Sequence, residues 1–141
     1  MILLVDHKDS FTRNLEHLLA RFDQVIVKDR LDLSDHLLQS STLIVLSPGP
    51  GKPSDYPETL ELVRKLIGKV PILGICLGFQ LLLELEGARI IRQSQVLHGV
   101  CTEISTVPES ITYQGFSQFM QVARYHSCLL YTSPSPRDLR L

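Results

Sequence analysis

The sequence predicts an α/β protein with an open, mostly parallel sheet and helices on both faces of that sheet. Short, wholly apolar runs, typical of strands buried on both faces, alternate with segments whose apolar residues repeat at helical spacing. One such run also leads through Gly-x-Cys-x-Gly into an amphipathic segment, the layout of a tight strand-to-helix turn. This alternation implies parallel strands connected by helices.

The expected elements follow in order along the chain. Strands are expected over residues 2–5, 25–27, 42–46, 71–74 and 88–92. Helices are expected over residues 11–22 with Ser10 as the N-cap, and over residues 31–39, 60–67 and 77–86. Residues 6–9 form a polar turn, and residues 47–57 form a loop rich in Pro and Gly. Beyond His98, residues 100–107 and 120–124 are expected to be strands with antiparallel edge pairing.

Length, composition and charge exclude several classes of protein. The 141 residues correspond to one domain, and 44% hydrophobic with 21% charged residues is typical of a packed core. A net charge of −1 argues against nucleic acid or an anionic membrane as a partner held by bulk charge. No apolar run approaches the roughly 18 residues of a membrane span, and no signal peptide is expected. Three cysteines are too few and too widely spaced for a disulfide framework or a metal site, so a cytoplasmic protein with reduced thiols and no cofactor is expected.

Cys76 is the first candidate for chemistry. It lies between Gly74 and Gly78 where an apolar strand meets a helix, and the same layout with serine carries the nucleophile of many hydrolases. The helix N-terminus favours a thiolate, and the amide of Leu77 is in position to bind an oxyanion. A buried structural cysteine between two packing glycines is the alternative, and it is the favoured interpretation for Cys101 and Cys128.

The loop Ser-Pro-Gly-Pro-Gly-Lys-Pro, residues 47–53, leaves the preceding strand at the same sheet edge. Its prolines stiffen it, and its glycines allow its backbone to approach a ligand. It lacks the spacing of a phosphate-binding P-loop. The amide of Gly51 is therefore a candidate for the second oxyanion donor, and an ordinary rigid turn is the alternative.

Taken together, these motifs resemble the class I glutamine amidotransferases, in particular component II of anthranilate synthase and aminodeoxychorismate synthase. The matching stretches, in family order, are residues 3–6, 9–12, 46–51, 74–80, 98–99 and 124–127. The resemblance implies a flavodoxin-like sheet that is incomplete at the C-terminus. It assigns residues 1–127 to a truncated amidotransferase domain.

The resemblance also implies a mechanism. Cys76 would attack the carboxamide of glutamine, the amides of Gly51 and Leu77 would hold the oxyanion, and ammonia would leave. Glutamine would be bound by Gly49, Pro50, Gly51, Gln80 and the backbone of Ser127. The ammonia would pass to a chorismate-binding synthase subunit, component I. Residues 9–12 and 98–99 are candidates for the wall of the glutamine site and the partner surface, or else a helix N-cap and a turn.

The sequence departs from the family near its C-terminus. The family completes its triad with a histidine and a glutamate two residues apart, and no His-x-Glu pair occurs in this chain. Residues 128–141 resemble translated adapter sequence and are expected to be a non-native tail; a natural divergent tail is the alternative. His7, His17 and His36 are expected to be exposed and to offer no substitute base. The chain as written is therefore expected to have little or no glutaminase activity.

Two other functions stay open at this point. One is a non-catalytic partner-binding module on the same fold, against which the retained Cys76 and Gln80 argue. The other is a different cysteine hydrolase acting on small amides or γ-glutamyl compounds.

Overall fold

The computed structural model describes the backbone of residues 1–131 and all their side chains except those of 93, 95, 97, 126, 127 and 129–131. The described residues form two compact units, one of Met1–Ile90 together with residues 130–131 and one of Ile91–Leu129. Within residues 1–131, no helix is both long and apolar enough to cross a membrane.

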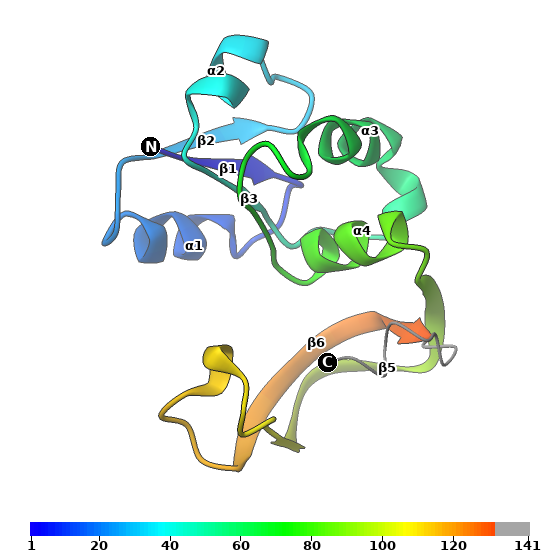
Figure 1. Ribbon diagram of the computed structural model, residues 1–141. Helices are drawn as coiled ribbons and strands as arrows, with labels where there is room; N and C mark the ends of the chain where they lie inside the picture. The colour runs from blue at the N-terminus through cyan, green and yellow to red at the C-terminus, as the bar shows by residue number, and fades with distance from the viewer. Residues whose placement is uncertain (132–141) are drawn as a thin grey trace. The chain divides into compact units, whose positions relative to one another are not determined.

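The first unit is built on a four-stranded parallel sheet (Figure 1). The strands are β1 (Ile2–Asp6), β2 (Val25–Asp29), β3 (Leu43–Leu46) and β4 (Ile72–Gly74), in the order β2-β1-β3-β4. β1 is central: Leu4 pairs with Val27 on one side and with Val45 on the other. The predicted parallel sheet and its first four strands are confirmed.

Alternate side chains of the sheet are covered on opposite faces. The face that carries Leu3 and Val5 packs against three helices, α2 (Asp35–Ser40), α3 (Pro57–Leu66) and α4 (Leu77–Leu85). The face that carries Ile2 and Leu4 packs against α1 (Thr12–Leu19). These four β1 side chains are at most 4% exposed, and each contributes about 1.5–3 kcal/mol through burial. The predicted helices on both faces are confirmed.

The turn between β1 and α1 differs from the prediction in its capping. Phe11 precedes the first helical residue, Thr12, so Ser10 is not the N-cap. Two aspartates order this turn instead. The Asp9 carboxylate accepts the N–H of Phe11 at 2.8 Å, and the Asp6 carboxylate accepts the hydroxyl of Thr12 at 2.8 Å. Carboxylates compete well for such donors, which explains why serine is displaced from this role.

The second unit holds a separate two-stranded sheet of β5 (Arg89–Ser105) and β6 (Phe119–Tyr131). The two strands run in opposite directions, and the short 3-10 helix η2 (Ile111–Tyr113) lies between them along the chain (Figure 1). Residues 88–92 and 100–107 were predicted as two separate strands, but residues 89–92 and 100–105 belong to one long strand, β5. The two strands expected beyond His98 are present and run antiparallel, and they pair with each other in a sheet separate from the four-stranded one (Figure 1).

His98 and Gly99 lie inside β5, so the prediction of a turn there is wrong. The ring of His98 meets the ring of Tyr125 edge-on, with centroids 5.0 Å apart. β6 continues past the expected domain boundary at Ser127 as far as Tyr131. The rest of the expected tail, residues 132–141, lies outside the described residues.

Candidate active site

Cys76 occupies a sharp turn between β4 and α4. It is exposed, and its backbone has φ 53° and ψ −106°, a conformation that L residues rarely adopt. The turn is held on both sides: the N–H of Ile75 donates to the carbonyl of Leu46 at 3.0 Å, and the N–H of Gln80 donates to the carbonyl of Cys76 at 3.0 Å. The tight strand-to-helix turn that the sequence predicts around Cys76 is therefore present. Its cysteine precedes the positive end of a helix, where an anion is stabilised.

The two flanking glycines are required by close packing. A Cβ on Gly74 would lie 2.5 Å from the backbone of Gly78, and a Cβ on Gly78 would lie 2.6 Å from the Cβ of Leu46. Real Cβ atoms do not approach other atoms so closely. The N-terminus of α4 thus lies directly against the ends of β4 and β3, and this contact fixes the position of Cys76 at the carboxyl edge of the sheet. Open α/β sheets place their sites at this edge.

The backbone strain at Cys76 predicts that the residue type at this position affects the free energy of unfolding. Glycine adopts this conformation without a steric penalty, whereas alanine retains the penalty. We expect the Cys76→Gly variant to have a free energy of unfolding about 1 kcal/mol higher than the Cys76→Ala variant. Urea unfolding of the two variants, which both lack the thiol, checks this. An alanine variant as stable as the glycine variant would show that the turn is unstrained.

The Pro-Gly loop after β3 lies beside this turn. A Cβ on Gly49 would come within 2.7 Å of both Leu77 Cδ2 and His7 Cβ, so the loop contacts the residue that follows the nucleophile. Gly51 has φ +78°, which favours glycine. The hydroxyl of Tyr56 donates to the carbonyl of Pro50 at 2.6 Å. The loop and the nucleophile turn, predicted from motifs 25 residues apart, are brought together as expected.

His7 is buried beneath this loop, with 1% of its surface exposed, so the prediction that it is solvent-exposed is wrong. Its backbone N–H donates to Ser47 Oγ at 2.9 Å. Its ring nitrogens lie 3.3 Å from Ser47 Oγ (Nδ1) and 3.3 Å from Thr59 Oγ1 (Nε2). Burial, together with the charge of Arg30, lowers the pKa of His7 from 6.5 to about 4, so the ring is neutral at pH 7.

The hydrogen bonds indicate which nitrogen of His7 carries the proton. The hydroxyl of Ser47 donates its one hydrogen to the carbonyl of Pro48 at 2.7 Å. Ser47 Oγ therefore accepts from His7 Nδ1–H, and Nε2 accepts from the hydroxyl of Thr59. A buried ring with both nitrogens satisfied is a rigid support and not a free base.

The remaining candidates fall into two groups. Gln80 is half-buried in the first turns of α4, four residues after Cys76. Ser127 and His98 belong to β6 and β5 of the second unit, as do Cys101 and Cys128. Cys101 is exposed and Cys128 is partly exposed, so the prediction that both are buried is wrong. His17 and His36 are exposed, as predicted. Sequence reasoning missed His7 and Tyr56, although a histidine directly after a buried strand, at the edge where sites lie, was a usable signal.

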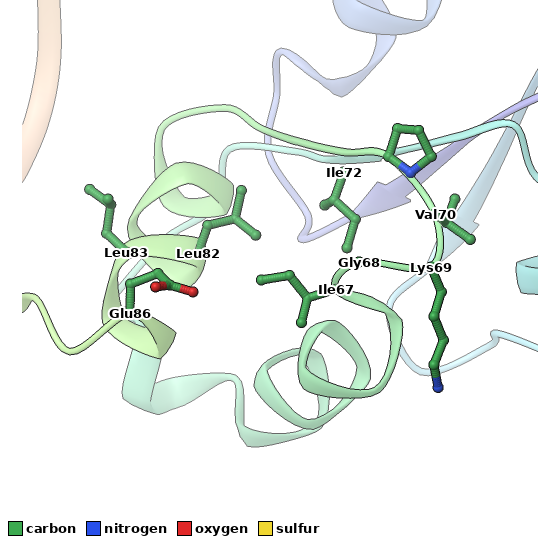
Figure 2. Close-up of a pocket in the computed structure, with 9 residues that line it drawn as sticks. Ile67, Gly68, Lys69, Val70, Ile72, Leu82, Leu83 and Glu86 are labelled. Atoms are coloured by element: carbon green, nitrogen blue, oxygen red, sulfur yellow. The ribbon is translucent and has the colours of Figure 1, made fainter. Parts of the chain in front are cut away.

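A cavity of about 500 Å3 lies in a different part of the first unit (Figure 2). It is formed where the last turns of α3 and α4 meet the start of β4. Its lining is mostly apolar and includes Ile67, Val70, Ile72 and Leu82, with Lys69 and Glu86 as charged members. It lies at the amino end of β4, whereas Cys76 follows the carboxyl end, so it is not the site of the nucleophile.

Known proteins resemble this chain in sequence. A sequence model of the family described as "Glutamine amidotransferase class-I" matches residues 3–141. The chain is 38% identical to aminodeoxychorismate synthase component 2 of Klebsiella aerogenes, covering 99% of this chain and 73% of that protein. It is 34% identical to anthranilate synthase component 2 of Lactococcus lactis, covering 92% and 66% of the two chains. A Bacillus subtilis relative named "Aminodeoxychorismate/anthranilate synthase component 2" is 31% identical over 96% of this chain and 71% of its own length.

Solved structures support the fold. A glutamine amidotransferase from Thermotoga maritima superposes with a TM-score of 0.74 at 20% identity, over 92% of this chain and 61% of that chain. A putative GMP synthase protein from Thermoplasma acidophilum superposes with a TM-score of 0.79 at 24% identity, over 94% and 67% of the two chains. The sequence match to the family spans both units. The chain belongs to the class I glutamine amidotransferase family.

Proposed function

We propose that this chain is the glutaminase subunit of a chorismate-utilising synthase, forming either anthranilate or 4-amino-4-deoxychorismate. The observation that carries the proposal is Cys76, held at positive φ at the N-terminus of α4 with the Pro-Gly loop against the next residue. The names of the relatives, which are component 2 proteins of both kinds of synthase, favour this branch of the family.

In the proposed reaction, Cys76 Sγ bonds to the carboxamide carbon of glutamine. The amides of Gly51 and Leu77 stabilise the tetrahedral oxyanion, and Gly49, Pro50, Gln80 and the backbone of Ser127 bind the substrate. The carbon–nitrogen bond then breaks as the nitrogen takes up a proton, which releases ammonia. Water hydrolyses the γ-glutamyl thioester to glutamate and regenerates the thiol. A thiol nucleophile needs reducing conditions, so the proposal places the reaction in the cytoplasm.

This chain lacks a His-x-Glu pair, and none of the three histidines of the first unit has the features of a replacement base. His7 is buried with both ring nitrogens occupied, while His17 and His36 are exposed on helices. Release of ammonia requires a proton donor at the leaving nitrogen. We therefore propose that the 141-residue chain acylates slowly with glutamine and turns it over poorly.

An activated substrate tests the nucleophile alone, because its leaving group needs no general acid. The γ-(4-nitrophenyl) ester of L-glutamate expels 4-nitrophenolate without protonation, so it needs only the thiolate and the oxyanion donors. We expect one γ-glutamyl group on Cys76, mapped by mass spectrometry of the intact chain and its peptides, and no sustained release of ammonia from glutamine.

Cys101→Ser serves as the matched control, because Cys101 is also exposed. We expect this variant to acylate like the parent and Cys76→Ser to lose the adduct completely. An adduct spread over all three cysteines, or none at all, would overturn the proposed nucleophile. Equal acylation by 4-nitrophenyl acetate would favour a general cysteine hydrolase over a glutaminase.

A further inference from the structure

Tyr56 connects the two segments that surround the proposed oxyanion site. Its hydroxyl donates to the carbonyl of Pro50, in the Pro-Gly loop, at 2.6 Å. Its ring is 6% exposed and belongs to one buried cluster with Leu77 and Leu81 of α4. One side chain therefore contacts the helix that begins at the nucleophile and the loop that faces it.

The Tyr56 ring is itself held in place from two sides. The ring of His7 meets it edge-on, with centroids 5.2 Å apart. The guanidinium of Arg30 lies 5.0 Å from its centroid, and Arg30 is ion-paired with Glu58. Aromatic and cation–π contacts of this kind restrict a ring to one orientation. The hydroxyl consequently presents a fixed donor to the loop.

His7 supports the first half of the same loop. It bonds Ser47 Oγ through its backbone N–H and through Nδ1, and its Cβ contacts Gly49. Ser47 in turn donates to the carbonyl of Pro48. The loop is thus fixed at Ser47 and Gly49 by His7 and at Pro50 by Tyr56, immediately before Gly51.

We propose that Tyr56 and His7 are positioning residues for the oxyanion-binding loop, which they hold at the distance from Leu77 that a tetrahedral intermediate requires. This inference rests on the proposed function, because it assumes that the loop donates an amide to the oxyanion. Oxyanion donors act only at hydrogen-bond distance from the developing charge, so a small displacement of the loop has a large effect on rate. Neither side chain touches the substrate in this proposal.

Tyr56→Phe tests the proposal with little risk to folding, because it retains the ring and removes only the hydroxyl. Two reagents are compared on the same thiol. The γ-(4-nitrophenyl) ester of L-glutamate passes through a tetrahedral oxyanion. Iodoacetamide alkylates the thiolate by displacing iodide at a saturated carbon and forms no oxyanion.

We expect Tyr56→Phe to slow acylation about tenfold, less than the loss of a whole oxyanion donor, and to leave alkylation unchanged. Tyr113→Phe is the matched control: Tyr113 is 37% exposed and lies in the second unit, and we expect neither rate to change. His7→Leu should slow acylation similarly. His7→Asn should restore much of the rate, because its amide nitrogen offers a donor to Ser47 Oγ.

The outcomes separate the positioning role from the proposed function. A parent chain that acylates on Cys76, with a Tyr56→Phe variant that acylates equally fast, overturns the positioning role and leaves the function standing. Equal slowing of acylation and alkylation also overturns it, because the thiol itself would then be affected. A parent chain that alkylates but never acylates overturns both proposals.

Discussion

Gly78→Ala is expected to lower the free energy of unfolding by more than about 3 kcal/mol, or to prevent folding. A Cβ at this position would overlap the carbonyl oxygen of Leu46 and lie 2.6 Å from the Leu46 Cβ. Leu46 is fully buried in the central part of the sheet, so neither side can yield without moving α4 away from β3. The same carbonyl accepts the N–H of Ile75, and this hydrogen bond would be lost with the shift.

Helix propensity alone predicts the opposite sign for this substitution. Gly78 is the second residue of α4, and alanine is favoured over glycine by up to about 1 kcal/mol in a helix. Gly68→Ala is the matched control, since Gly68 has φ +78° but no atom within 4 Å of the added Cβ. There we expect a loss of only about 1 kcal/mol, from backbone strain. Urea unfolding of both variants checks the contrast, and a Gly78→Ala variant within about 1 kcal/mol of the parent would contradict the packing argument.

The stability of the chain is expected to fall by about 3 kcal/mol between pH 6.5 and pH 4 because of His7 alone. Burial and the charge of Arg30 lower the pKa of this histidine to about 4, while Asp6 and Asp29 oppose the shift. Below pH 6.5 the unfolded chain binds a proton at His7, whereas the folded chain does not bind one until the pH approaches 4. Acid therefore favours unfolding. The loss is complete near pH 4, where the folded state also takes up the proton, and it is absent above pH 6.5.

The variant His7→Asn isolates this contribution from that of the carboxylates. Measured by urea unfolding at about pH 7 and about pH 4.5, the parent should lose more stability than His7→Asn by roughly 2–3 kcal/mol. His36→Asn is the control, because it replaces a histidine that is exposed and not buried. Identical slopes for the parent and His7→Asn would mean that His7 is accessible to solvent in the folded state.

The parts of the fold that were predictable are those in which local pattern and tertiary environment agree. The apolar runs of β1 and β3 have no alternative to burial, and the Gly-Ile-Cys-Leu-Gly sequence admits few backbone conformations. By contrast, β5 was predicted as separate strands because its middle is polar. Such a strand has no apolar alternation to reveal it.

The place of His7 after a buried strand was a signal of its role, but its burial and its hydrogen-bond partners were not predictable from its neighbours. It lies in a polar tetrapeptide, Asp-His-Lys-Asp, which is typical of an exposed turn. Its burial depends on Ser47 and Thr59, which are 40 and 52 residues away in the sequence. Tyr56 is similar, because its contact with Leu77 joins two helices whose packing no local pattern encodes. The catalytic and binding roles of Cys76, Gly51, Leu77, Gln80 and Ser127 stay predictions.

The central place of β1 has a consequence for synthesis. Its apolar residues are made before those of both strands that it pairs with, β2 on one edge and β3 on the other. The second edge is therefore unpaired until Leu46 has been added. During this interval a nascent chain presents a short, β-prone apolar segment with open backbone groups, the kind of template on which strands of other chains assemble. Slow translation of residues 7–46 would prolong that exposure and increase the demand for chaperones.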